Sequence, residues 1–214
     1  MSADEKQPLI TPPGSRRQRY VLVIHGGAGT MQRENSTPEQ RSAYRSALAE
    51  SLLSGYQVLS QGGDAMDAAV CAVSVMEGGR TNKLVGRIGD TPLMGSGYWA
   101  EEWKNSGWVK RVWNKINRRG EIKAVGGTGD GDYFIRHAAA VTVARRVRYR
   151  NESLDKASQG VVEDLLKDGG IGGLIALDNR GNVSMPLNCP GMYRGVIRED
   201  GLPKTAIFFD EEVA

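Results

Sequence analysis

The chain contains few of the residues that hold disulfide-rich or metal-dependent folds together. Its 214 residues include two cysteines, Cys71 and Cys189, and two histidines, His25 and His137. Cysteines this few and this far apart form neither a disulfide framework nor a zinc knuckle, so we read both as free thiols in a reducing compartment. The histidines share no ligand spacing. We therefore expect no metal site and no cofactor.

Long apolar segments and a strong net charge are also missing. No run approaches the roughly 20 apolar residues of a membrane span, and the polar start of the chain, Met1–Arg17, does not resemble a signal peptide. The net charge of +3, with 40% hydrophobic and 25% charged residues, is that of a soluble globular protein. It argues against nucleic-acid and membrane partners. We expect a cytoplasmic protein.

The length fits one domain with a loose end. Residues 1–18 contain three prolines and a Ser/Arg cluster, and we expect a disordered leader there, followed by one domain over residues 19–214. All four tryptophans lie between residues 99 and 113 beside lysines and arginines. Aromatic side chains among basic residues can stack on nucleobases, but a flap that packs on its own domain is the commoner reason for such a segment.

Hydrophobic periodicity and capping residues predict helices and short strands. Thr37, Pro38 and Gln40 form a helix start with a capping box ahead of a periodic segment that runs to about Ser60. The next helix, 65–76, is small and apolar nearly all round, so we expect it to pack inside a layer. The remaining expected elements are a buried strand over 20–24 that stops at the glycines of 25–29, helices over 133–149 and 154–167, and antiparallel strands over 174–177, 183–187, 193–198 and 205–209.

These strands and helices occur in blocks instead of alternating strictly. Such an order favours a layered α+β fold, with helices outside paired sheets.

The turn Gly86–Pro92 carries two opposite charges three residues apart. A guanidinium such as that of Arg87 binds a carboxylate through two parallel hydrogen bonds, and a carboxylate such as that of Asp90 suits a cationic amine. Together the two side chains match the head group of an α-amino acid. The alternative is an ordinary surface ion pair, which contributes little.

A second glycine-rich segment, Val125–Asp132, precedes the helix expected at 133–149. Backbone N–H groups at such a junction can receive an oxyanion. The negative charges of Asp130 and Asp132 argue against a phosphate ligand at this segment. The earlier segment His25–Gly29 lacks the Gly-Lys-Ser/Thr ending of a phosphate loop.

Five segments in the same order resemble the plant-type L-asparaginases and isoaspartyl peptidases, which are N-terminal-nucleophile hydrolases with a threonine nucleophile. The matching segments are His25–Gly29, Gly62–Ala69, Asn82–Pro92, Gly127–Asp132 and Gly169–Asp178.

The resemblance implies an αββα sandwich, made as a precursor that is cut at a Gly-Thr bond to free the catalytic threonine. It implies that the Gly-Arg-x-Gly-Asp motif holds the α-carboxylate and α-amine of the substrate. It also implies that the Thr-Gly pair of the later loop orients the amide and stabilises the oxyanion. The substrate-binding residues expected on this basis are Arg87, Ile88, Gly89, Asp90, Thr128, Gly129, Asp130 and Gly131.

The chain departs from the family pattern after the second helix. Roughly a hundred residues that the family has there are missing, including the Gly-Thr-Val-Gly strand that starts the catalytic subunit. No catalytic residue is therefore assigned, and the expected sandwich is incomplete. The Trp-rich segment 98–123 resembles an insertion between the two binding loops.

The resulting expectation is an asparaginase or isoaspartyl-peptidase type of hydrolase, acting on the Asn side-chain amide or on β-aspartyl peptides, with impaired activity. The alternative is a non-catalytic remnant that binds an amino acid or a partner protein. The expected partner is a small-molecule substrate, L-asparagine or a β-aspartyl dipeptide. Whether the protein forms a homodimer is left open.

Overall fold

The computed structural model describes residues 20–29, 31–78, 98–100 and 122–213. The elements in chain order are β1 (Val21–Gly29), the 3₁₀ turn η1 (Arg33–Asn35), α1 (Pro38–Ser60), α2 (Ala65–Gly78), β2 (Tyr98–Ala100), β3 (Ile122–Gly129), α4 (Gly131–Arg136), α5 (Ala139–Arg150), α6 (Leu154–Lys167), β4 (Gly172–Asp178), β5 (Val183–Ser184), β6 (Gly191–Arg198) and β7 (Lys204–Phe208).

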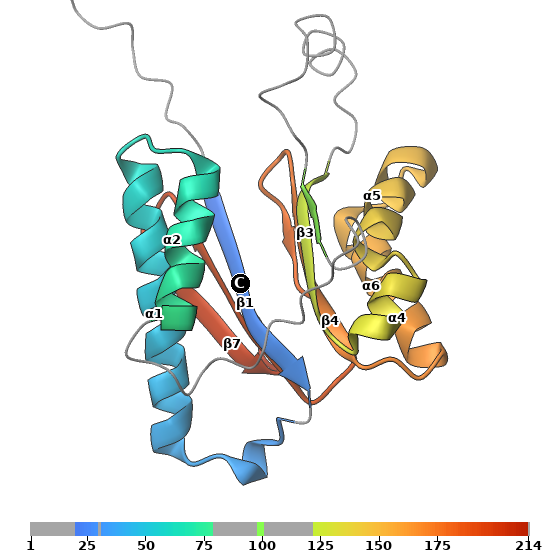
Figure 1. The fold of residues 1–214 in the computed structure, drawn as a ribbon, viewed down its shortest axis with the longest axis horizontal. Helices are drawn as coiled ribbons and strands as arrows, with labels where there is room; N and C mark the ends of the chain where they lie inside the picture. Colours follow the sequence, from blue (N-terminus) through green and yellow to red (C-terminus); the bar gives the residue numbers. More distant parts are fainter. Residues whose placement is uncertain (1–19, 30, 79–97, 101–121, 214) are drawn as a thin grey trace, which may run out of the picture.

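The described elements form four layers, as the sequence predicts. One antiparallel sheet has the order β1-β6-β7 and the other has the order β2-β3-β4-β5. Figure 1 shows α1 and α2 covering the first sheet, α4, α5 and α6 covering the second, and the two sheets facing each other in the middle. The α+β, αββα prediction is confirmed.

Helix α1 begins and packs as its sequence predicts. The Thr37 hydroxyl accepts a hydrogen bond from the Gln40 N–H at 3.2 Å, and the Gln40 side chain accepts one from the Thr37 N–H at 2.9 Å. Leu48 and Leu52, which lie one turn apart, are almost completely buried against the first sheet. The same combination of a cap and an apolar stripe forms α6, where the Ser153 hydroxyl accepts from the Lys156 N–H.

The prediction that the first strand stops at residue 24 is wrong. Strand β1 continues through the glycines to Gly29 and pairs with β6, with a bulge between His25 and Gly27. Gly27 has φ +132°, a conformation that other residues rarely adopt, so the glycine lets the strand pass the bulge and continue. The glycines therefore belong to the sheet and do not form a loop at the tip of the strand.

The segment 125–129 is likewise part of a strand, β3, and the helix expected over 133–149 is divided. Helix α4 ends near His137, and α5 begins after Ala138, whose φ is +44°. Local contacts stabilise this break, because the Thr142 hydroxyl donates to the His137 carbonyl at 2.8 Å and the His137 imidazole contacts Asp168 Oδ2 at 2.7 Å. The contact with Asp168 comes from a residue far along the chain, so the helix pattern of 133–149 does not reveal it.

The last strands are antiparallel, as predicted, but they belong to both sheets. The strand expected over 183–187 is shorter, since β5 ends at Ser184 and Leu187 makes an isolated bridge to Gly173. Pro186 lies between them and has no N–H to donate to a ladder.

Helix α2 differs from its prediction in a way that bears on the edge of the first sheet. It packs mainly against α1 and reaches the sheet chiefly at β1, while α1 packs across β1, β6 and β7. Ala68 and Ala72 face the core, but the side chains of Met66 and Val70 are 60% and 57% exposed. The helix thus lies at the surface with apolar side chains uncovered, because β1 is the last described strand beneath it.

The two sheets meet where β1 packs against β3 and β4. A Cβ on Gly126 would lie 3.3 Å from Nε2 of His25, so the glycine makes room for the imidazole. The Nδ1 atom of His25 is buried and has no hydrogen-bond partner within the described ranges. Burial lowers the pKa of His25 to about 4, because the charged imidazolium would lose its hydration between the sheets.

A close contact between layers predicts that Gly55→Ala destabilises the fold. A Cβ on Gly55 would lie 2.7 Å from the carbonyl oxygen of Ala68 and even closer to Leu22, so α1 would have to move away from α2 and β1. We expect a loss of about 1–3 kcal/mol in the free energy of unfolding, measured by urea denaturation. The gain of up to ~1 kcal/mol in helix propensity opposes this loss.

Gly160→Ala in α6 is the matched control, because the three heavy atoms nearest to its Cβ all belong to the guanidinium end of the Arg146 side chain, which moves more easily than backbone. Equal stability effects at the two positions would contradict the packing argument.

The buried imidazole predicts a pH-dependent loss of stability. The unfolded chain binds a proton at a pKa of about 6.5, while the folded chain resists it until about pH 4. The stabilisation present above pH 6.5 is therefore lost as the pH falls from 6.5 to 4, by up to ~3 kcal/mol.

Denaturation of wild type and His25→Gln at pH 7.5, 6.5 and 5.5 measures this effect, since the carboxylates titrate mainly below that range. We expect a smaller slope in the variant. Parallel slopes would show that His25 is not buried as described.

Candidate substrate-binding segment

The predicted site residues fall into two groups. Arg87, Ile88, Gly89 and Asp90 lie outside the described residues, so their geometry stays a prediction. Thr128, Gly129, Asp130 and Gly131 lie at the end of β3 and the start of α4.

Thr128 lies on the side of β3 that faces the other sheet. Gly127 faces the helices, because a Cβ there would meet Phe134 at 2.5 Å and Leu174 at 2.8 Å. Gly126 faces β1 and His25. Side chains alternate along a strand, so half-buried Thr128 shares the inter-sheet side with Gly126. Its hydroxyl is therefore presented toward the space between the sheets.

The backbone after Thr128 is fixed by two glycines that approach each other closely. Gly129 has φ +137°, and a Cβ there would lie 2.5 Å from Cα of Gly172, on the neighbouring strand β4. A Cβ on Gly172 would in turn collide with the carbonyl oxygen of Thr128. Only glycine fits at both positions, so the end of β3 has a single tightly defined path.

Asp130 closes this end of the strand pair. Its N–H donates to the Ile171 carbonyl at 2.8 Å, and its Oδ2 accepts from the Ile171 N–H at 3.0 Å. One carboxylate oxygen and the N–H of Asp130 thus form hydrogen bonds within the fold. This N–H is therefore not available to bind an oxyanion. The arrangement gives Asp130 a role in positioning Thr128 and Gly129.

His25 is the neighbour of this segment that the sequence did not identify as part of a site. The alternation of side chains along the strand could have identified it. Leu22 and Ile24 face the helices, so His25, one residue on, faces the other sheet. Its neutral imidazole can accept or donate a hydrogen bond but carries no charge near neutral pH.

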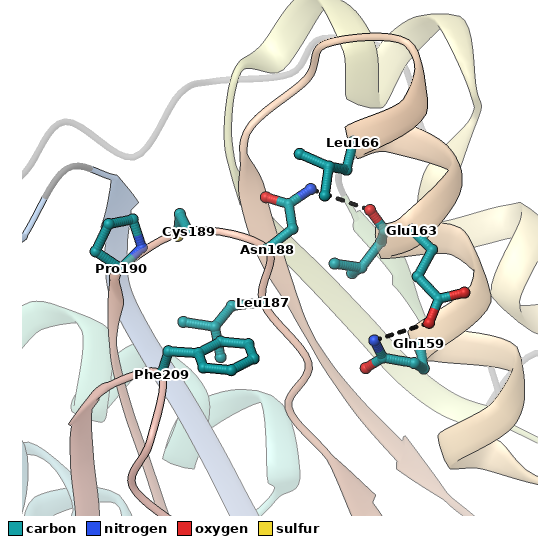
Figure 2. Close-up of a pocket in the computed structure, with 9 residues that line it drawn as sticks. Gln159, Glu163, Leu166, Leu187, Asn188, Cys189, Pro190 and Phe209 are labelled. Carbon is teal, nitrogen blue, oxygen red and sulfur yellow. Dashed lines mark hydrogen bonds between the residues drawn. The ribbon is translucent and has the colours of Figure 1, made fainter.

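A pocket of about 460 Å³ lies elsewhere, between α6, the residues before β6, and Phe209. Figure 2 shows Leu166, Leu187, Pro190 and Phe209 around it, with Asn188 on its wall. The Asn188 amide donates to the carbonyls of Val162 and Gly170 and accepts from the Gly172 N–H.

Among the polar side chains of the pocket, Glu163 accepts a hydrogen bond from Gln159, so the carboxylate and the amides already bond to protein groups. The lining includes no arginine or lysine for a carboxylate. The pocket is therefore a poor match for a free amino acid, and it contains none of the predicted site residues.

Neither a metal-ligand cluster nor a membrane-spanning helix occurs in the described part of the chain. No three His, Cys, Asp or Glu side chains there come together as metal ligands would. None of the helices there has the length and apolar character needed to cross a bilayer.

Comparison with known proteins relates both halves of the described structure to one family. The family model described as Asparaginase matches residues 18–78 and 119–207. The match includes β1 and the segment 128–131. It leaves out residues 79–118, the interval that contains Arg87 and Asp90.

Several relatives carry related names. The isoaspartyl peptidase of Escherichia coli (strain K12) is 41% identical over 138 residues, which make up 64% of this chain and 37% of the relative. A probable isoaspartyl peptidase/L-asparaginase of Arabidopsis thaliana is 36% identical over 64% of this chain and 36% of its own length. One of Drosophila pseudoobscura pseudoobscura is 27% identical over 94% of this chain and 58% of its own length.

The chain spans about a third of the length of the first of these relatives. The family match nevertheless covers well over half of the chain, on both sides of the interval 79–118. The αββα layers and the glycine-defined end of β3 agree with that match. The chain therefore belongs to the asparaginase family that includes the plant-type L-asparaginases and isoaspartyl peptidases.

Proposed function

We propose that the protein recognises the substrates of an asparaginase or isoaspartyl peptidase, namely L-asparagine or a β-aspartyl dipeptide, and hydrolyses them poorly. The proposal rests on the geometry of the segment Thr128–Gly131. Its backbone path is set by the close approach of glycines and by the hydrogen bond that the Asp130 carboxylate accepts from the Ile171 N–H. A hydroxyl beside a rigid turn is suited to orient an amide. The relatives named for these activities support the substrate class.

The head group of the substrate is assigned to the opposite charges of the Gly86–Pro92 turn. Arg87 would bind the α-carboxylate through two hydrogen bonds, and Asp90 would accept from the α-amine. Thr128 would then contact the side-chain amide. This division of roles follows from the chemistry of the three groups and from the family resemblance.

Poor hydrolysis follows from the sequence, because no Gly-Thr-Val-Gly segment exists in the chain. Without an attacking threonine the covalent step is lost, which typically lowers rates by several orders of magnitude. The protein would then act as an amino-acid binder that retains the recognition half of the reaction.

Titration calorimetry with L-aspartate and L-asparagine tests recognition. We expect measurable heat for wild type, no binding for Arg87→Ala, and unchanged binding for Arg180→Ala, a matched control that removes an exposed arginine from the turn between β4 and β5. Absence of heat with wild type, or equal effects of the two variants, would overturn the proposed role of the turn.

Thr128→Val and Thr128→Ser test the hydroxyl. The valine variant keeps the volume but loses the hydrogen bond, so we expect about tenfold weaker binding, while serine retains most of the affinity. Ammonia release from L-asparagine should stay at the level of a heat-treated sample. Clear turnover, or cleavage of the chain into two stable fragments, would contradict impaired hydrolysis.

A further inference from the structure

The segment that follows β5 leaves one edge of the second sheet open beside Leu187. The residues on either side of Leu187 bond to β4. The Pro186 carbonyl accepts from the Leu174 N–H at 2.9 Å, and the Asn188 N–H donates to the Gly172 carbonyl at 3.0 Å. Along an antiparallel pair, such residues alternate with residues whose N–H and C=O point away from the partner strand. The backbone groups of Leu187 therefore point away from β4, toward the outer edge of the sheet.

These two backbone groups are unpaired although Leu187 is only 5% exposed. Neither its N–H nor its carbonyl has a hydrogen-bond partner among the residues that the structure describes. Buried backbone groups without a partner are rare, because each loses its bonds to water on folding. One donor and one acceptor on the same residue are the groups that a neighbouring antiparallel strand would use.

The pocket of about 460 Å³ lies along this edge, since its lining includes Leu187 and the next three residues. Figure 2 shows α6, with Leu166 and Glu163, on one side of the pocket and Phe209 on the other. Phe209 follows β7, which belongs to the first sheet. The open edge thus faces a slot between a helix layer and the other sheet, and an extended strand fits between such layers.

The walls of the slot are apolar and carry one negative charge. Leu166 and Phe209 are 52% and 64% exposed, so large apolar side chains are uncovered on both sides. Glu163 is the charged side chain of the described lining, which contains no lysine or arginine. Gln159 donates to Oε1 of Glu163 at 3.1 Å, and Oε2 has no hydrogen bond within the described ranges. The slot therefore suits apolar side chains together with a positive charge.

We propose that the slot binds an extended segment of a partner protein, which adds an antiparallel strand beside Leu187 and combines large apolar residues with a basic one. The residue opposite Leu187 exchanges both backbone hydrogen bonds with it and shares its face of the sheet. Leu187 packs in a cluster with Met192 of β6, so this face is that of the first sheet, where Phe209 lies. The two neighbouring residues of the segment face α6, one apolar toward Leu166 and one basic toward Glu163.

A peptide satisfies this surface better than a small apolar molecule. Such a molecule would fill the space between Leu166 and Phe209 but would leave the N–H and carbonyl of Leu187 unpaired. Peptides that add a strand to an open edge obtain affinity from the backbone hydrogen bonds and specificity from pockets for alternate side chains. The Leu187 edge and its slot provide both.

Fluorescence anisotropy with a labelled peptide of sequence Thr-Leu-Phe-Lys-Thr tests the proposal. We expect saturable binding to the full chain with a Kd below about 1 mM. Replacement of the peptide lysine by glutamate should weaken binding about three- to tenfold, and Glu163→Gln should remove this difference. Methylation of the phenylalanine nitrogen removes the donor to the Leu187 carbonyl and should weaken binding about tenfold.

Leu166→Ser and Leu202→Ser are matched variants for the wall of the slot. Leu202 is 63% exposed, but it lies between β6 and β7 and does not line the pocket. Both side chains are exposed, so circular dichroism should show two folded proteins. We expect about tenfold weaker peptide binding for Leu166→Ser and unchanged binding for Leu202→Ser.

Three results would overturn the proposal. The first is absence of binding at peptide concentrations up to about 1 mM, and the second is equal binding of the N-methylated peptide. The third is an equal effect of the two leucine variants. Sedimentation without peptide examines a second copy as the occupant, because self-association that Leu166→Ser abolishes would assign the slot to the chain itself and overturn the peptide partner.

Discussion

The contact between β1 and β3 is the constraint on which the rest of the structure depends. The His25 imidazole fills the space that Gly126 leaves, and this contact joins two sheets that otherwise carry separate helix layers. The histidine remains neutral there because burial lowers its pKa to about 4. The same approach of the sheets places Thr128 in the space between them. The position of the candidate site therefore depends on how the two sheets pack.

The glycine-rich motifs act mainly by permitting close approach of backbones. Gly129 and Gly172 bring β3 and β4 together where any Cβ would collide, and Asp130 holds that end through both polar groups of Ile171. The proposed binding segment is therefore built in before a ligand arrives, which would lower the ordering cost of recognition. Membership in the asparaginase family is consistent with this construction, because the matched residues include it.

The sequence predicted those features that depend on local pattern. The capping box at Thr37, the apolar stripe of α1 and the four-layer arrangement were all confirmed. Features that depend on contacts distant in sequence were missed. The continuation of β1 through its glycines needs β6 as a partner, and the break at Ala138 involves the contact of His137 with Asp168. The exposure of Val70 on α2 depends on how many strands lie beneath the helix, and the sequence of the helix alone does not show that number.

The central claim is that the shortened chain folds with its two sheets face to face, β1 against β3. Nuclear Overhauser spectroscopy on labelled protein measures this contact directly, through a cross-peak between the His25 ring protons and the Gly126 Hα protons. The structure predicts that this cross-peak is present and disappears in His25→Gln. Its absence in a well-folded sample, with the helices and the β1–β6 pairing intact, would contradict the sandwich.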